Sequence, residues 1–222
     1  KNMYNLSLNV KRLLILNISI FILGGILSRD FIIQYFAFFN PVLPGNEELL
    51  NPNFMIWQPL TYMFFHGGFS HLFGNMFALF IFGTNIEYYM GSKKFLNYYL
   101  LTGVGAALLY AVYNSFQMQA SGVDSDPYWA MASTPMIGAS GAVFGLLIAY
   151  GVLFPNVELF LLFIPFPIKA KYFVTFYGLY ELYLGSSGVQ SGVAHFAHVG
   201  GLVAGFILLQ FFGFKNRDFS RF

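Results

Sequence analysis

The sequence has little charge and no cysteine. Charged residues make up only 9% of the 222 residues, and cysteine is absent. The absence of cysteine excludes disulfide bonds and a thiol nucleophile. Because an average soluble domain carries about 25% charged residues, the composition is far from that of a soluble protein. The formal net charge of +2 gives no reason to expect a nucleic-acid partner.

The sequence is instead rich in apolar residues. Hydrophobic residues make up 57% of the chain and aromatic residues 21%. A helix of roughly 20 mostly apolar residues is long enough to cross a bilayer, and several such stretches are present. We therefore predict one all-α, polytopic domain over residues 1–222 that is embedded in the lipid bilayer. The predicted transmembrane spans are residues 12–29, 71–90, 95–117, 138–154, 169–185 and 193–213.

Lysine and arginine predict how these spans are oriented. With six spans the two ends of the chain lie on one side, and ten of the eleven basic residues fall on that side, with Arg29 as the exception. Basic residues favour the cytoplasmic side. We expect cytoplasmic termini, outward loops at 30–70, 118–137 and 186–192, and a multi-pass protein of the bacterial inner membrane.

Proline interrupts two segments between the spans. Residues 30–70 combine four prolines with many aromatic residues, so we interpret this first outer loop as lying in the membrane interface. Pro165 and Pro167 lie within residues 158–173. Because proline disfavours a continuous helix, we predict a short interfacial turn there, before the fifth span.

A few polar side chains fall within the predicted spans. His71 and Asn75 are four residues apart and share one helix face. Ser140 begins the fourth span, and His198 lies in the sixth. Polar groups inside a bilayer are costly and often functional. Since these four lie at a similar shallow depth near the outer side, they are candidates for one site.

Small residues accompany the serine and the histidine. Gly141 and Gly145 follow Ser140 at helical spacing, and Gly201 and Gly205 follow His198 in the same way. Such strips let two helices approach until their backbones nearly touch. That approach is what a short serine side chain needs to reach an imidazole.

Together these residues suggest a nucleophile, a base and an oxyanion hole. The alternatives are that the small residues only pack helices and that each histidine only bonds to a neighbour. A metal site at His195 and His198 lacks an H-E-x-x-H motif and an Asp to complete the ligands, so we expect no metal. Glu181 is the one carboxylate at this depth, and we interpret it as an interfacial capping or pairing residue, which leaves a Ser-His dyad.

The chain resembles the rhomboid family of intramembrane serine proteases. The resemblance is carried by GASG around Ser140, by AHVGGLVAGF with His198, and by HGGFSHLFGNMFALFIFGTNIEYYMGSKKF with His71 and Asn75. It covers residues 12–213 and implies a six-helix bundle. It also implies a protein substrate with a transmembrane helix, no cofactor, and entry gated by the fifth span and the loop 186–192.

The resemblance also assigns roles. Ser140 is the expected nucleophile and His198 the general base, while His71, Asn75 and the Ser140 backbone N–H donate to the oxyanion. Phe144 stands where better-known bacterial members often have Tyr, and it keeps a ring to stack on the histidine. The expected supporting glycines are Gly138, Gly141, Gly201 and Gly205.

Two other functions are alternatives to proteolysis, and the first of them uses the same fold. A pseudoprotease binds transmembrane helices without cleaving them, but such relatives lack the serine or the histidine, and this chain keeps both. A transporter calls for broken helices in matching halves or for rings of charge, and the two halves of this sequence show no matching motif. We therefore expect an intramembrane serine endopeptidase.

Overall fold

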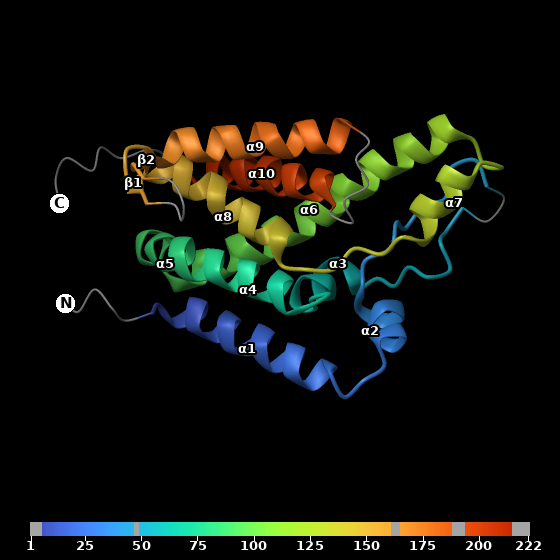
Figure 1. The fold of residues 1–222 in the computed structure, drawn as a ribbon, viewed down its shortest axis with the longest axis horizontal. Coiled ribbons are helices and arrows are strands. Elements are labelled where there is room, and N and C mark those ends of the chain that lie inside the picture. Colours follow the sequence, from blue (N-terminus) through green and yellow to red (C-terminus); the bar gives the residue numbers. More distant parts are fainter. Residues whose placement is uncertain (1–5, 47–48, 161–164, 188–193, 215–222) are drawn as a thin grey trace.

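Helices make up nearly all of the regular structure in the computed structural model of the chain (Figure 1). The structure describes residues 6–46, 49–160, 165–187 and 194–214. Two short turns interrupt the helices, the 3₁₀ turn η1 and the π-helical turn η2. The elements in chain order are α1 (Leu8–Gly24), α2 (Arg29–Phe36), α3 (Gln58–Thr61), η1 (Tyr62–Phe64), α4 (Phe69–Ala78), η2 (Leu79–Gly83), α5 (Thr84–Met90), α6 (Ser92–Ser121), α7 (Asp126–Ser133), α8 (Ser140–Leu153), β1 (Glu158–Leu159), β2 (Ile168–Lys169), α9 (Ala170–Ser186) and α10 (His195–Phe211).

Each predicted span falls on a helix, and the helical class is confirmed. The continuous helical stretches Phe69–Met90 and Ser92–Ser121 are long and apolar enough to cross a membrane. The helices α8 and α10 are also apolar but have only 14 and 17 residues. The presence of six spans therefore stays a prediction.

The predicted first span extends too far. The helix α1 ends at Gly24, and α2 begins at Arg29. The hydroxyl of Ser28 accepts a hydrogen bond of 3.2 Å from the backbone N–H of Phe31, which caps the start of the new helix. A second capping serine, Ser125, starts α7 within the predicted loop 118–137. Polar caps at these two points explain why the outer segments contain helices that an apolar pattern does not indicate.

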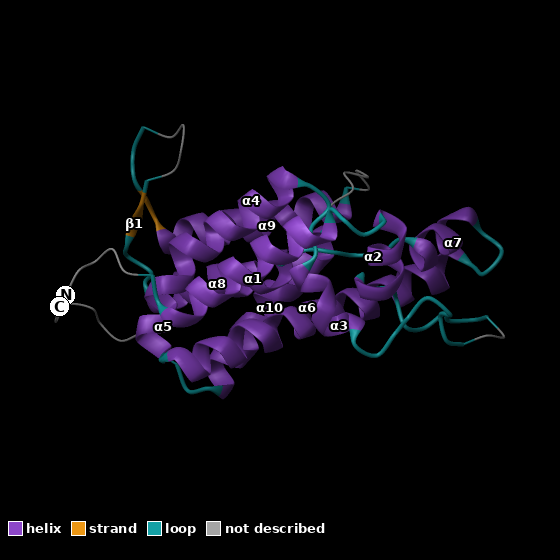
Figure 2. Cartoon of the chain, turned by 90° about the horizontal axis from the view of Figure 1, so that it is seen from below, coloured by secondary structure: helices purple, strands orange, loops and turns teal. Residues whose placement is uncertain are grey.

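Two short strands lie between α8 and α9, and residues 161–164 between them lie outside the described residues. β1 and β2 pair antiparallel, with Glu158 opposite Lys169. This agrees with the prediction that residues 158–173 do not form one helix. Figure 2 shows the strands and α5 at one end of the molecule, while α2 and α7 lie at the opposite end.

The centre of the molecule consists of α6, α8 and α10, which pack most extensively against one another (Figure 1). Eleven of the fourteen residues of α8 are buried. A helix that is apolar on all sides lies in a protein core or in a membrane, and the contacts that bury α8 on its neighbours make it the central element. Its backbone also takes part in tertiary contacts, since the Tyr98 hydroxyl donates to the carbonyl oxygen of Gly145 at 2.7 Å.

Glycines set the distance between α8 and α10. A Cβ atom added at Gly201 would overlap the carbonyl oxygen of Gly141, and one added at Gly205 would lie 2.9 Å from the Cα of Gly145. Real Cβ atoms do not approach so closely. The two glycine strips seen in the sequence therefore face each other, with the backbones in direct contact.

A buried carboxylate attaches α1 to the rest of the bundle. Glu87, on α5, accepts hydrogen bonds of 3.0 Å from the backbone N–H groups of Asn9 and Val10, in the first turn of α1. The Ser92 hydroxyl donates to the same carboxylate at 2.7 Å. A negative charge at a helix N-terminus pairs with unsatisfied N–H groups and with the helix dipole. Glu87 thus acts as the N-cap of a helix distant in sequence.

This contact predicts the effect of neutralising the carboxylate. Glu87→Gln keeps the side-chain shape and one acceptor oxygen but removes the charge. Hydrogen bonds to charged groups contribute about 1.5–3 kcal/mol, so we expect a loss of stability of about 1–2 kcal/mol. A lower thermal midpoint of the purified variant in detergent would show it, and a midpoint equal to that of the unmodified protein would contradict the capping role.

Candidate active site

Ser140 is the first residue of α8 and is partly exposed. The chain reaches it through Gly138, which has φ +121°, a conformation that side chains other than glycine rarely adopt. The N–H of Gly138 donates to the carbonyl oxygen of Tyr62 at 3.0 Å. Because the first N–H groups of a helix have no intrahelical partner, the backbone at Ser140 offers free donors next to its hydroxyl.

His71 and Asn75 converge on this turn from α4. A Cβ atom added at Gly138 would lie 2.5 Å from Nε2 of His71 and 3.7 Å from Nδ2 of Asn75. The Nδ1 atom of His71 accepts a long hydrogen bond of 3.5 Å from the N–H of Gly67. An imidazole that accepts at Nδ1 carries its proton on Nε2. Nε2 of His71 and Nδ2 of Asn75 therefore lie beside Gly138, two residues before Ser140.

A second histidine, His66, also contacts this turn. Its Nε2 accepts a hydrogen bond of 3.5 Å from the N–H of Ala139, and its ring centroid lies 5.2 Å from that of His71. Burial and the neighbouring His71 lower the pKa of His66 to about 4. The ring is thus neutral at pH 7 and able to accept this bond. His66 is the first residue of the HGGFSHLFGNMF motif, but the motif alone did not predict its contact with Ala139.

His198 lies on α10, opposite the start of α8. Its ring stacks on Phe144 with a centroid distance of 4.3 Å and an angle of 10° between the planes. Phe144 is one turn after Ser140, and Gly141 touches Gly201 one turn after His198. The structure therefore brings the two helix faces together. Within the described part of the chain, no hydrogen bond joins the Ser140 hydroxyl to His198.

Glu181 completes this group from α9. Its Oε2 atom lies 2.8 Å from Nδ1 of His198 and 2.7 Å from Nδ1 of His195. The side chain of Glu181 is 5% exposed. From the sequence, Glu181 is predicted to be an interfacial capping or pairing residue, whereas in the structure it lies against the candidate base. The position of Glu181 within an apolar span could have indicated this role. A carboxylate inside an apolar helix is costly and usually has a specific partner.

The same three residues resemble a set of metal ligands. One ligand atom from each of Glu181, His195 and His198 lies within 4.8 Å of the others, so Glu181 places a carboxylate beside the two histidines where the sequence offered no Asp. The distances of 2.7 and 2.8 Å are those of charge-assisted hydrogen bonds. Two ligand atoms that each lie about 2.0–2.2 Å from a tetrahedral zinc ion would be farther from each other than these distances. The distances from Oε2 of Glu181 to the two Nδ1 atoms therefore fit hydrogen bonds better than coordination of a shared metal ion.

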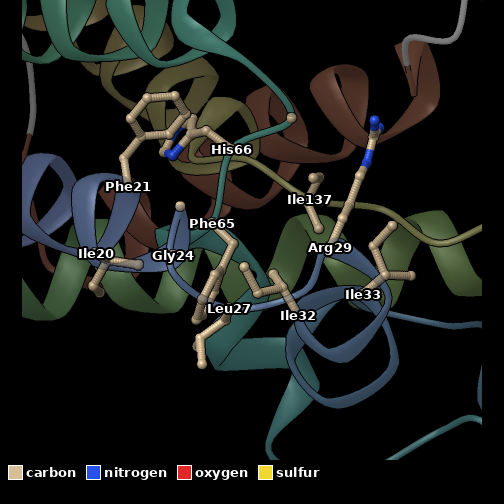
Figure 3. Close-up of a pocket in the computed structure, with 12 residues that line it drawn as sticks. Ile20, Phe21, Gly24, Leu27, Arg29, Ile32, Ile33, Phe65, His66 and Ile137 are labelled. Atoms are coloured by element: carbon tan, nitrogen blue, oxygen red, sulfur yellow. The ribbon is translucent and has the colours of Figure 1, made fainter.

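A pocket of about 300 Å³ borders the site on the side of α1 and α2 (Figure 3). Most of its lining is apolar, including Ile20, Phe65 and Ile137, and His66 forms one edge. The side chain of Arg29 extends past Ile137, away from the apolar residues. The pocket thus borders the site at His66, at Ile137 and at Gly67, whose N–H donates to His71.

The expected gating elements are described only in part. Residues 188–193, which make up most of the loop 186–192, lie outside the described residues. The helix α9 packs against both α8 and α10. It contacts the site directly, because Tyr177 lies beside Phe144 with a centroid distance of 5.1 Å.

Known proteins match the chain over the same region. A family model described as Rhomboid domain matches residues 53–215. RHOMBOID-like protein 4 of Arabidopsis thaliana is 34% identical over 152 residues, which are 68% of this chain and 33% of that protein. Rhomboid protease AarA of Providencia stuartii is 31% identical over 164 residues, 68% of this chain and 54% of that protein. Rhomboid protease GluP of Bacillus subtilis is 29% identical over 184 residues, 82% of this chain and 30% of that protein.

The matched part of the chain thus spans between about a third and about half of these relatives. The family match includes α4, α8, α9 and α10, the helices that carry the candidate site. Because the model covers more than half of the sequence, the relationship does not depend on one short motif. The chain belongs to the rhomboid family of integral membrane proteins.

Proposed function

We propose that this chain is an intramembrane serine endopeptidase that cleaves single-pass transmembrane proteins. The observation that supports this best is the close approach of α8 and α10 at Gly141 and Gly201, next to Ser140 on one helix and one turn after His198 on the other. Two relatives are named rhomboid proteases. The chain keeps both Ser140 and His198, which favours an enzyme over a pseudoprotease that only binds transmembrane helices.

In the first step Ser140 attacks the carbonyl carbon of the scissile bond. Its hydroxyl proton moves to Nε2 of His198, and the carbonyl oxygen becomes an oxyanion. The Ser140 backbone N–H, Nε2–H of His71 and the Nδ2 amide of Asn75 donate to that oxygen. The C–N bond then breaks as His198 returns the proton to the leaving amine.

The second step removes the acyl group from the enzyme. Water replaces the amine, gives a proton to His198 and attacks the ester carbon. Collapse of the second oxyanion breaks the ester bond, and His198 returns the proton to the Ser140 oxygen. The reaction is thus balanced without a cofactor or metal, and it requires water next to Ser140.

The length of α8 supports a reaction below the membrane surface. Fourteen residues at 1.5 Å per residue span about 21 Å, against a hydrocarbon thickness of about 30 Å. If the end of α8 at Leu153 lies near one surface, Ser140 lies several ångströms below the other. We propose six spans with both termini in the cytoplasm of a bacterium, because basic residues flank the ends of helices on the side of the termini.

The nucleophile and the base act as a unit, which predicts the kinetics of their variants. We expect Ser140→Ala and His198→Ala each to lower cleavage of a transmembrane substrate by at least about a thousandfold, and the double variant to be no worse than either. Cleavage is followed in proteoliposomes by gel electrophoresis, with thermal midpoints as the folding control. Substantial cleavage by folded Ser140→Ala would remove Ser140 from the mechanism.

A serine mechanism also predicts independence of metal ions. Because the carboxylate and imidazoles of Glu181, His195 and His198 are joined by hydrogen bonds, EDTA should leave the cleavage rate unchanged. The rate is measured before and after chelation and again after addition of zinc. Loss on chelation with recovery on zinc would identify these three residues as ligands instead.

Gly138 offers a test of the oxyanion hole. Gly138→Ala adds a Cβ atom that would meet His71 at 2.5 Å, so we expect it to displace this donor. Removing one oxyanion donor costs about 10²–10³ in kcat. The matched control is Gly122→Ala, which also has a positive φ, of +81°, and open space around the added atom. Both variants place alanine at a positive φ, and only Gly138→Ala should lose cleavage. Equal rates in the two variants would exclude this role of His71.

A further inference from the structure

The proposed mechanism gives no role to Glu181, a buried carboxylate that contacts two histidines of the site. Glu181 accepts from Nδ1 of both His195 and His198 through one oxygen atom, Oε2. Glu181, His195 and His198 are all buried. A desolvated carboxylate is stable only where charged or polar partners compensate it, so these two contacts explain how α9 tolerates the residue.

The contact with His198 determines which nitrogen of its ring carries the proton. An ionised carboxylate only accepts hydrogen bonds, so Nδ1 of His198 donates to Oε2 of Glu181. The other nitrogen, Nε2, then keeps its lone pair in the neutral ring. This is the atom that receives the Ser140 proton in the proposed mechanism.

Two contacts together hold the ring of His198. Phe144 covers one face at 4.3 Å, which limits tilting of the ring. Glu181 binds the edge at Nδ1 from a different helix, which limits rotation about the Cβ–Cγ bond. A face contact and an edge contact leave the imidazole one orientation.

We propose that Glu181 is the positioning residue of the catalytic histidine, so that the site is a Ser140–His198–Glu181 triad and not a dyad. Glu181 stays ionised throughout. Its charge stabilises the imidazolium that forms when Ser140 gives up its proton, and the proton moves only between Ser140, Nε2 of His198 and the leaving group. This inference rests on the proposed function, because it assigns a partner to the base named there.

The main rival role for Glu181 is structural. The same oxygen binds His195, so the carboxylate also ties α9 to the start of α10. A purely structural contact between α9 and α10 would affect stability and leave the chemistry of His198 unchanged. The two roles differ in what happens to the reaction rate and to the His198 tautomer when the carboxylate is neutralised.

The first measurement is the rate of covalent labelling by a small fluorophosphonate in detergent. Glu181→Gln keeps the size of the side chain and removes its charge, and we expect labelling to fall by at least about tenfold. For a transmembrane substrate, kcat should fall while KM stays within about twofold, because the lost interaction forms in the transition state. Glu181→Asp keeps the charge, and we expect it to recover part of the rate.

Glu87→Gln is the matched control. Glu87 is also a buried carboxylate on a helix of the bundle, and its partners are the first turn of α1 and Ser92. Its loss should lower the thermal midpoint and leave the labelling rate unchanged. If Glu181→Gln behaves in the same way, with lower stability and an unchanged rate, Glu181 is a structural tie and the inference is wrong.

The second measurement needs no Glu181 variant. The chain contains only four histidines, so ¹⁵N-histidine NMR can resolve each ring, and single substitutions assign the signals. We expect protonated Nδ1 and unprotonated Nε2 for His198 in the unmodified protein, and a mixture of tautomers in Glu181→Gln. A His198 ring protonated only on Nε2 in the unmodified protein would overturn the inference even if Glu181→Gln does not fold.

These outcomes separate the inference from the function on which it rests. If the unmodified protein is not labelled at Ser140, the proposed function fails. If Ser140 is labelled, and neither the rate nor the tautomer depends on Glu181, the function stands and only the triad is wrong.

Discussion

The backbone contact between α8 and α10 is the constraint on which the rest of the site depends. Gly201 meets the carbonyl of Gly141 with no room for a Cβ atom, so the two helix axes cannot separate or rotate without losing packing. This contact fixes the height of Ser140 on one helix relative to His198 on the other. It also lets Phe144 cover the imidazole. A larger side chain at either glycine would push α8 and α10 apart. It would therefore move Ser140 away from His198 without altering either residue.

Polar groups from two other helices approach this contact. His71 and Asn75 approach the start of α8 from α4, and Glu181 approaches His198 from α9. Each would be costly alone in an apolar medium, and each has a partner here. The polar groups therefore support one another, as expected for a site whose orientation is fixed before the substrate binds.

The sequence predicted the helices of the bundle and the facing glycine strips because both are periodic properties of the chain. It placed the end of α1 wrongly and did not indicate α2 or α7, since their starts depend on single capping serines. It also set Glu181 aside. The pairing of Glu181 with His198 spans 17 residues of sequence and depends on how α9 rotates against α10, which no local pattern records.

The central claim of this account is that the start of α8 presents Ser140 as a nucleophile. The most direct test is to react the protein in detergent with a fluorophosphonate, digest it, and locate the adduct by mass spectrometry. The account predicts one modified residue, Ser140, and no modification in the His198→Ala variant. An adduct on another serine, or none on a protein that cleaves its substrate, would contradict it.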